Sequence, residues 1–226
     1  MRCYPIVAAA LLLAASRPDA TPLSPTCTSG YAVPQRPYVA MRRLEASNTK
    51  SGKEGWLEAR TTLGADGQLA VEILDEGGSE QIRNRVLRAA LEREQELVAS
   101  RGASNPIASD DPYECVEPEL DPSGLIRVPL RPRRKDVNLV YGDLFKQPAT
   151  GDLVRVAGRL AKSPSFWVSQ VDVEWRYERV HNDVVLPVSL HSNAKVKIFG
   201  PSTFRMTYEY VSVDGQPVAE STTASR

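Results

Sequence analysis

The residues best suited to chemistry are few and far apart in this sequence. The chain has 226 residues and only two histidines, His181 and His191. We expect His181 in a turn and His191 in a strand, and no cysteine lies near either of them at the spacing of a metal-ligand set. The sequence therefore predicts no metal site.

Two short segments match the serine-x-x-lysine pattern of penicillin-recognising enzymes, SNTK at 47–50 and SNAK at 192–195. In those enzymes the serine begins a helix and further motifs accompany it, whereas both segments here fall where strand and turn are expected. Acidic pairs at 75–76 and 110–111 lie beside turn residues, where solvated carboxylates are common. We therefore expect no enzyme activity and no cofactor.

Composition and charge are those of an ordinary globular protein. Hydrophobic residues make up 42% of the chain, charged residues make up 25%, and the formal net charge is zero. A neutral chain lacks the bulk positive charge that attracts nucleic acid, so we expect no nucleic-acid partner. The length favours one large β-rich domain over two small ones.

The first twenty residues have the pattern of a secretory signal. Arg2 precedes the apolar run PIVAAALLLAA, and the exit segment SRPDA ends at Ala20. A membrane anchor is the weaker interpretation, because the run is too short to span a bilayer. We therefore expect residues 1–20 to be a cleaved signal peptide. The mature chain is then periplasmic or secreted and has no transmembrane segment.

Cleavage at Ala20 would also remove Cys3 and leave Cys27 and Cys115. In an oxidising compartment these two cysteines can form a disulfide. Two free thiols are the other interpretation, and the spacing favours neither.

Alternating hydrophobicity predicts strands along most of the chain after a proline-rich tether at 21–37. The expected strands are 38–47, 56–63, 68–74, 124–132, 137–148, 153–162, 167–180, 184–200 and 203–215. Because most connections between them are short, we expect a mainly antiparallel sheet. Residues 38–215 would form one domain, and 216–226 a flexible tail.

One helix is expected at 79–99, with Ser79 as its cap and a broad apolar stripe that includes Ile82, Val86 and Leu91. Residues 100–124 are rich in Pro, Ser, Asp and Gly and predict a long loop or lid, with a short strand at YECVE. A single helix is a thin cover for about nine strands. The sheet must therefore curl, pack as a sandwich, or be covered by the loop or a ligand.

A basic turn follows the strand at 124–132. Its segment RPRRKD contains Arg133, Arg134 and Lys135. The ordinary interpretation is an exposed turn. The functional interpretation is a contact with acidic lipid headgroups or with an acidic partner.

The segment VPLRPRRKDVNLVYGDLFKQPATGDLVRVAGRL, 128–160, resembles the central part of the LolA-like outer-membrane lipoprotein-sorting proteins. It has a strand ending in the step Leu130-Arg131-Pro132-Arg133, and then two strands joined at the turn 150–152. The likeness extends over about 38–215. It implies an α+β fold with an open, curved, half-barrel antiparallel sheet and one main covering helix.

The resemblance also implies an apolar cavity and a periplasmic carrier of lipid or of an acylated protein. The faces that we expect to line the cavity, chosen by alternation, are Leu69, Val71, Ile73, Trp167, Val171, Val173, Trp175, Val196, Ile198, Phe204, Met206 and Tyr208. The alternative is that they form an ordinary dry core. The protein would then be a non-catalytic envelope domain that docks a protein partner. In either case we expect a monomer.

Overall fold

The computed structural model describes residues 36–101, 112–181, 184–198 and 200–218. The expected signal peptide, most of the tether, much of the long loop and most of the tail lie outside these residues.

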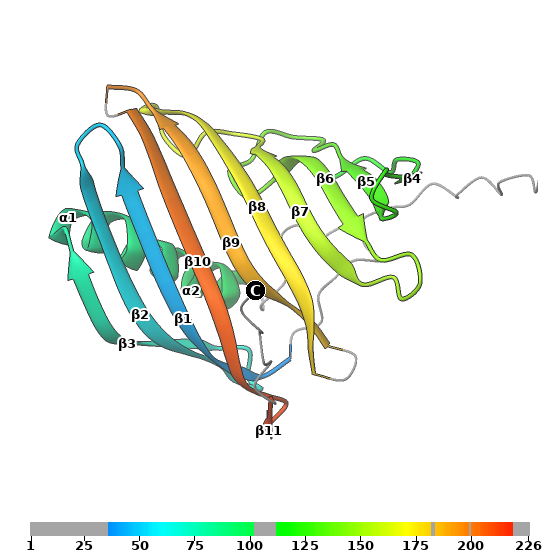
Figure 1. Cartoon of the computed structure of the whole chain (residues 1–226), viewed down its shortest axis with the longest axis horizontal. Helices are drawn as coiled ribbons and strands as arrows, with labels where there is room; N and C mark the ends of the chain where they lie inside the picture. The colour runs from blue at the N-terminus through cyan, green and yellow to red at the C-terminus, as the bar shows by residue number, and fades with distance from the viewer. Residues whose placement is uncertain (1–35, 102–111, 182–183, 199, 219–226) are drawn as a thin grey trace, which may run out of the picture.

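The described residues form one open, eleven-stranded antiparallel sheet with a helix on one side (Figure 1). The order across the sheet is β3-β2-β1-β10-β9-β8-β7-β6-β5-β4, and β11 pairs with β10. The strands are β1 (Tyr38–Asn48), β2 (Lys53–Leu63), β3 (Leu69–Gly78), β4 (Glu119–Leu120), β5 (Ile126–Leu130), β6 (Val140–Lys146), β7 (Leu153–Leu160), β8 (Val168–His181), β9 (Val184–Val196), β10 (Gly200–Val213) and β11 (Gln216–Pro217). The expected fold class, α+β with an open antiparallel sheet and one covering helix, is confirmed.

Alternation of burial, clearest in β2, separates an apolar from a polar face of the sheet. In β2 every second residue from Gly55 to Leu63 is buried, and those between are exposed or half-buried. Since successive side chains of a strand point to opposite faces, this pattern separates the two faces of the sheet. We call the face that carries the helix the inner face.

The helix runs through three segments, α1 (Glu80–Ile82), the π-helical η2 (Arg83–Arg88) and α2 (Ala89–Arg101). A π-helical turn accommodates an extra residue, so Ile82 and Leu87 both face the sheet although they are five apart. Val86, which a regular period would bury, is 40% exposed. Ser79 precedes the helix without a side-chain capping bond, and its carbonyl accepts from the backbone of Ile82 and Arg83 instead.

Three apolar clusters form the core. The first, under the helix, includes Leu44, Leu57 and Leu87. The second surrounds Tyr113 on the same face, toward the edge of the sheet formed by β4 and β5. The third, near Val213, closes one end of the strands. The helix packs against β1, β2 and β3. In the strand order β9 and β8 come after β10, so they lie beside the strands that the helix covers.

The two ends of the sheet differ in charge, because antiparallel order sends alternate connections to opposite ends. The connections after β1, β5, β7 and β9 lie at the top of Figure 1. We call this the lysine end, since Lys50, Lys135, Lys162 and Lys197 lie in these connections. The connections after β2, β4, β6 and β10 carry Asp66, Asp121, Asp152 and Asp214 and neither Lys nor Arg. We call this the aspartate end.

Candidate ligand-binding face of the sheet

Apolar side chains that are only half-buried line the inner face beside the helix. We call this set the inner wall: Val171, Trp175, Leu190, Ala194 and Phe204. Register places them together, because Val171 pairs with Ala194, Trp175 with Leu190, and Ser192 with Phe204. The inner wall therefore spans β8, β9 and β10, between the core under the helix and the core around Tyr113.

A pair of glycines shapes the inner face next to this wall. Gly142 of β6 and Gly158 of β7 are direct partners, and Gly158 also pairs with Val173. A Cβ atom on Gly142 would lie 2.1 Å from the carbonyl oxygen of Ala157 and 2.5 Å from Cα of Gly158. The two backbones thus approach too closely for any side chain.

A buried ion pair fixes the helix on the sheet. The Arg42 side chain is fully buried, and its Nη1 donates to Glu94 Oε2 of α2 at 2.5 Å. Nη2 donates to Glu94 Oε1 at 3.1 Å and to the Tyr38 hydroxyl at 2.6 Å, and the guanidinium lies 4.5 Å from the ring centre of Tyr208. Such charge-assisted, bidentate contacts are strong and directional. The helix is therefore clamped over β1.

Burial dominates the electrostatics of the tyrosines around Arg42. It raises the pKa of Tyr208 and Tyr210 well above the usual 10.0, although the charge of Arg42 acts in the opposite direction. Burial also raises the pKa of Tyr38. These phenols are therefore neutral at physiological pH.

The structure brings most of the predicted cavity residues to the inner side. Leu69, Val173 and Met206 are buried. Four others pack against the core under the helix, namely Val71, Ile73, Phe204 and Tyr208. Trp175 packs against the core around Tyr113, and Val171 and Val196 are half-buried on β8 and β9.

Two predicted residues lie outside the strands and are exposed. Trp167 precedes the first residue of β8 and is 51% exposed. Ile198 follows the last residue of β9 and is 68% exposed, with a positive φ of 71°. Alternation was extended past the true strand ends, where the chain turns and side chains no longer alternate.

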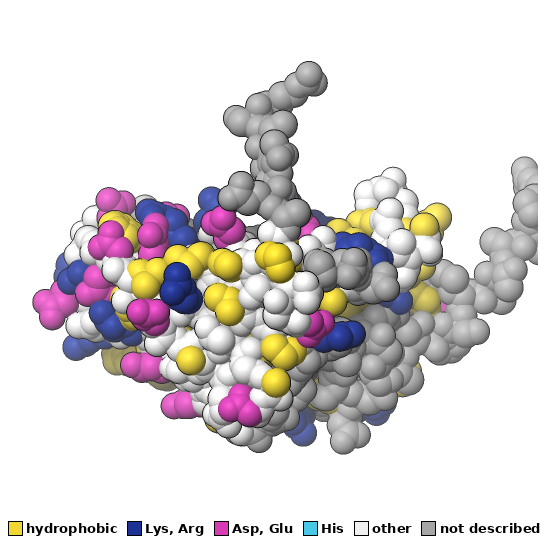
Figure 2. Space-filling view, turned by 90° about the horizontal axis from the view of Figure 1, so that it is seen from below, with side chains coloured by type: hydrophobic (Ala, Val, Ile, Leu, Met, Phe, Trp, Pro, Cys, Tyr) yellow, Lys and Arg dark blue, Asp and Glu magenta, His cyan; other side chains and the backbone are white. Residues whose placement is uncertain are grey.

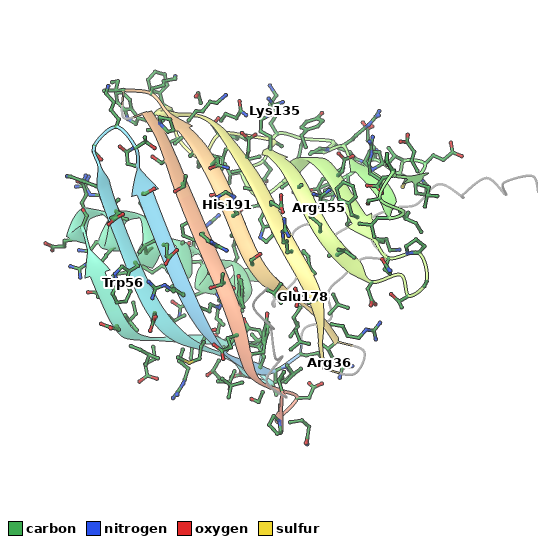
Figure 3. The ribbon with its side chains drawn as sticks, in the orientation of Figure 1. Arg36, Trp56, Lys135, Arg155, Glu178 and His191 are labelled. Carbon is green, nitrogen blue, oxygen red and sulfur yellow. The ribbon has the colours of Figure 1, made fainter. Side chains whose placement is uncertain are left out.

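The basic turn is exposed at the lysine end, where Figure 3 labels Lys135. Arg133 Nε donates to the Tyr113 carbonyl at 2.9 Å, and Arg134 lies 3.8 Å from Asp136. Arg133 thus holds the segment that carries Tyr113, while the Lys135 side chain reaches solvent.

Arg42 is the residue that sequence reasoning missed. It occupies an inward position in the series Ala40, Arg42, Leu44, Ala46, whose members are all buried. A charged residue at an inward position of a strand requires a buried partner, and that signal was present in the sequence.

Cys115 is disulfide-bonded. The two other cysteines lie outside the described residues, so pairing with Cys27 stays a prediction. His191 is exposed on the face of the sheet turned away from the helix (Figure 3).

Within the described ranges no group of three or more His, Cys, Asp or Glu side chains is placed to hold a metal ion. Among the helical segments that the structure describes, none has the length and hydropathy of a membrane span. Comparison with known proteins gave no match to a family, to a curated protein or to a solved structure. The chain is therefore assigned to a fold class, a large antiparallel sheet with one helix, and to no family.

Proposed function

We propose that this protein is a secreted, non-catalytic carrier of a lipid or an acyl chain, similar in type to the LolA-like sorting proteins. The observation that supports this function is the inner wall, which is apolar surface left partly accessible on the helix-bearing side of an open sheet. Ligand sites of soluble proteins are mostly apolar and concave. The inner wall would supply the apolar lining of such a site.

An acyl chain would lie along the inner wall, between Phe204 and Val171 and over Ala194. Each buried methylene contributes about 0.8 kcal/mol, so a chain of about a dozen carbons binds without a specific polar contact. The inner wall lies beside the helix and not beneath it. An acyl chain would therefore enter while the Arg42–Glu94 pair keeps the helix on the sheet. The polar head would lie toward the lysine end, where Arg134 and Lys135 are exposed.

The expected signal peptide would deliver the chain to the periplasm, where a lipid or an acylated protein is its cargo. Native mass spectrometry of mature protein purified from a periplasm tests this function, followed by solvent extraction of whatever it carries. Bound phospholipid or fatty acid supports the carrier. A bare mass, with no uptake of a fluorescent fatty acid, contradicts it and favours the envelope domain with a dry core.

A substitution that fills the inner wall with a larger side chain tests whether this surface is the binding site. Ala194→Phe adds a ring to the half-buried inner wall, so we expect loss of fatty-acid uptake with the fold retained. Ala70→Phe adds the same ring at an exposed position of β3 and should leave uptake unchanged. Equal uptake by both variants would show that the inner wall is not the site.

A further inference from the structure

Three large apolar side chains are exposed together at the lysine end. Phe166 is 77% exposed, Trp167 is 51% exposed and Ile198 is 68% exposed. We call these three residues the apolar tip. Single exposed apolar residues are common on proteins, but a cluster of them indicates a surface that contacts something apolar.

Contacts between its two segments show that the apolar tip is one surface. The rings of Phe166 and Trp167 pack edge to face at 5.5 Å, and the Lys197 backbone donates to the Trp167 carbonyl at 2.7 Å. Lys197 Nζ lies 4.1 Å from the ring centre of Phe166, and Lys50 Nζ donates to the Ile198 carbonyl at 2.7 Å. Each part of the tip therefore has a lysine beside it.

The three chain segments that form and flank the apolar tip carry charge of one sign. The segments 46–53, 161–171 and 192–204 contain no Asp or Glu, and their lysines are Lys50, Lys53, Lys162, Lys195 and Lys197. The aspartate end differs, since its turns contain aspartates. Figure 2 views the molecule from that end and shows acidic and basic side chains interspersed. A neutral protein thus concentrates positive charge around this exposed apolar cluster.

Ile198 carries a second signal in its backbone. Its φ of 71° lies in the left-handed region, which a β-branched residue seldom adopts and which favours Gly or Asn. Its side chain is exposed, so packing does not explain why isoleucine occupies this position. An exposed isoleucine in a strained turn indicates a function for the side chain itself.

We propose that the lysine end docks on the surface of an anionic phospholipid bilayer. The apolar tip enters the boundary between headgroups and acyl chains, and the five lysines lie over the phosphates. Aromatic side chains favour this boundary, and clustered lysines are attracted to anionic leaflets. The docking does not depend on a ligand at the inner wall, although it would place the lysine end against the membrane from which a carrier loads.

Vesicle binding by the full mature chain tests this proposal. One set of vesicles contains phosphatidylcholine and phosphatidylglycerol in equal parts, and the other contains phosphatidylcholine alone. We expect flotation with the anionic set, weakened by salt because charge attracts the protein. The partition coefficient of the variant Phe166→Ser/Ile198→Ser into anionic vesicles should fall about tenfold or more. This variant removes two of the three apolar side chains that would enter the membrane.

Matched controls keep the result specific. Leu120→Ser removes a side chain as exposed as Ile198, 68% in both cases, at the far edge of the sheet, and should bind as the unchanged protein does. Ala194→Phe should also keep its vesicle binding, which separates docking from uptake at the inner wall.

Ile198→Asn should change stability and vesicle binding in opposite directions. Asparagine tolerates positive φ, so the variant should melt at an equal or higher temperature while it binds vesicles less well. Equal partition of the unchanged protein and Phe166→Ser/Ile198→Ser would overturn the proposal. Equal binding to both vesicle sets would also overturn it. So would an absence of vesicle binding combined with capture of a protein partner through the same residues.

Discussion

The Arg42–Glu94 pair should be the most sensitive single contact in the fold. The change that tests it is Glu94→Gln, which keeps the shape of the side chain and removes its charge. Arg42 would then remain buried with its positive charge uncompensated, because its side chain is fully buried. Removing one partner of a buried pair typically costs about 3–5 kcal/mol.

The structure lowers that cost somewhat. The Glu94 side chain is 31% exposed, so water already reaches the pair, and the glutamine oxygen can still accept one bond from Arg42. We therefore expect a loss of about 2–3 kcal/mol in the free energy of unfolding. With a urea m value of about 2–3 kcal/mol per molar, the unfolding midpoint should fall by about 1 M.

The assay is equilibrium urea unfolding, followed by circular dichroism. Glu96→Gln is the control, because Glu96 lies on the same helix in an exposed pair with Arg93, and exposed pairs contribute about 0–1 kcal/mol. Arg42→Met/Glu94→Leu removes both charges and should recover most of the stability lost in Glu94→Gln. Equal midpoints for Glu94→Gln and Glu96→Gln would refute the reasoning.

Two further predictions concern the tyrosines and the glycine pair. The folded pKa of Tyr208 is raised by burial, so its contribution to stability is fully present below about pH 10 and is lost as the pH rises through the folded pKa. Urea midpoints at about pH 9 and pH 11 should therefore differ less in Tyr208→Phe than in the unchanged protein, and an equal difference would contradict this. A Cβ atom on Gly158 would lie 2.2 Å from the Tyr141 carbonyl oxygen, so Gly158→Ala should cost about 3 kcal/mol by thermal or urea unfolding. Gly151→Ala, which meets no atom within 4 Å but has a φ of 76°, should cost only about 1 kcal/mol.

Alternation in the sequence was sufficient to predict the long strands of the described region and the inward side of β3, β8 and β10. It missed the two-residue strands β4 and β11, which are too short to show a period. It could not place the strand ends. The alternation of apolar residues in the sequence extends to Trp167 and Ile198, although the hydrogen-bonded strands do not. A regular helical period likewise selected Val86 for the core, since a π-helical turn leaves no clear mark in the sequence. These errors arise where local pattern and tertiary pairing disagree.

The residues misassigned by alternation support the docking proposal. Trp167 and Ile198 are exposed at the lysine end, outside β8 and β9, whereas alternation assigned them to the lining of a cavity. On the inner face, by contrast, Trp175 of β8 and Phe204 of β10 pack against the cores and are half-buried. The chain thus has two apolar surfaces of different kinds, a half-buried one on the inner face and an exposed one at the lysine end. The strand direction connects them, because Val171 lies only a few residues from Trp167 along β8. This short separation along the chain is the physical reason to test docking and uptake in the same protein.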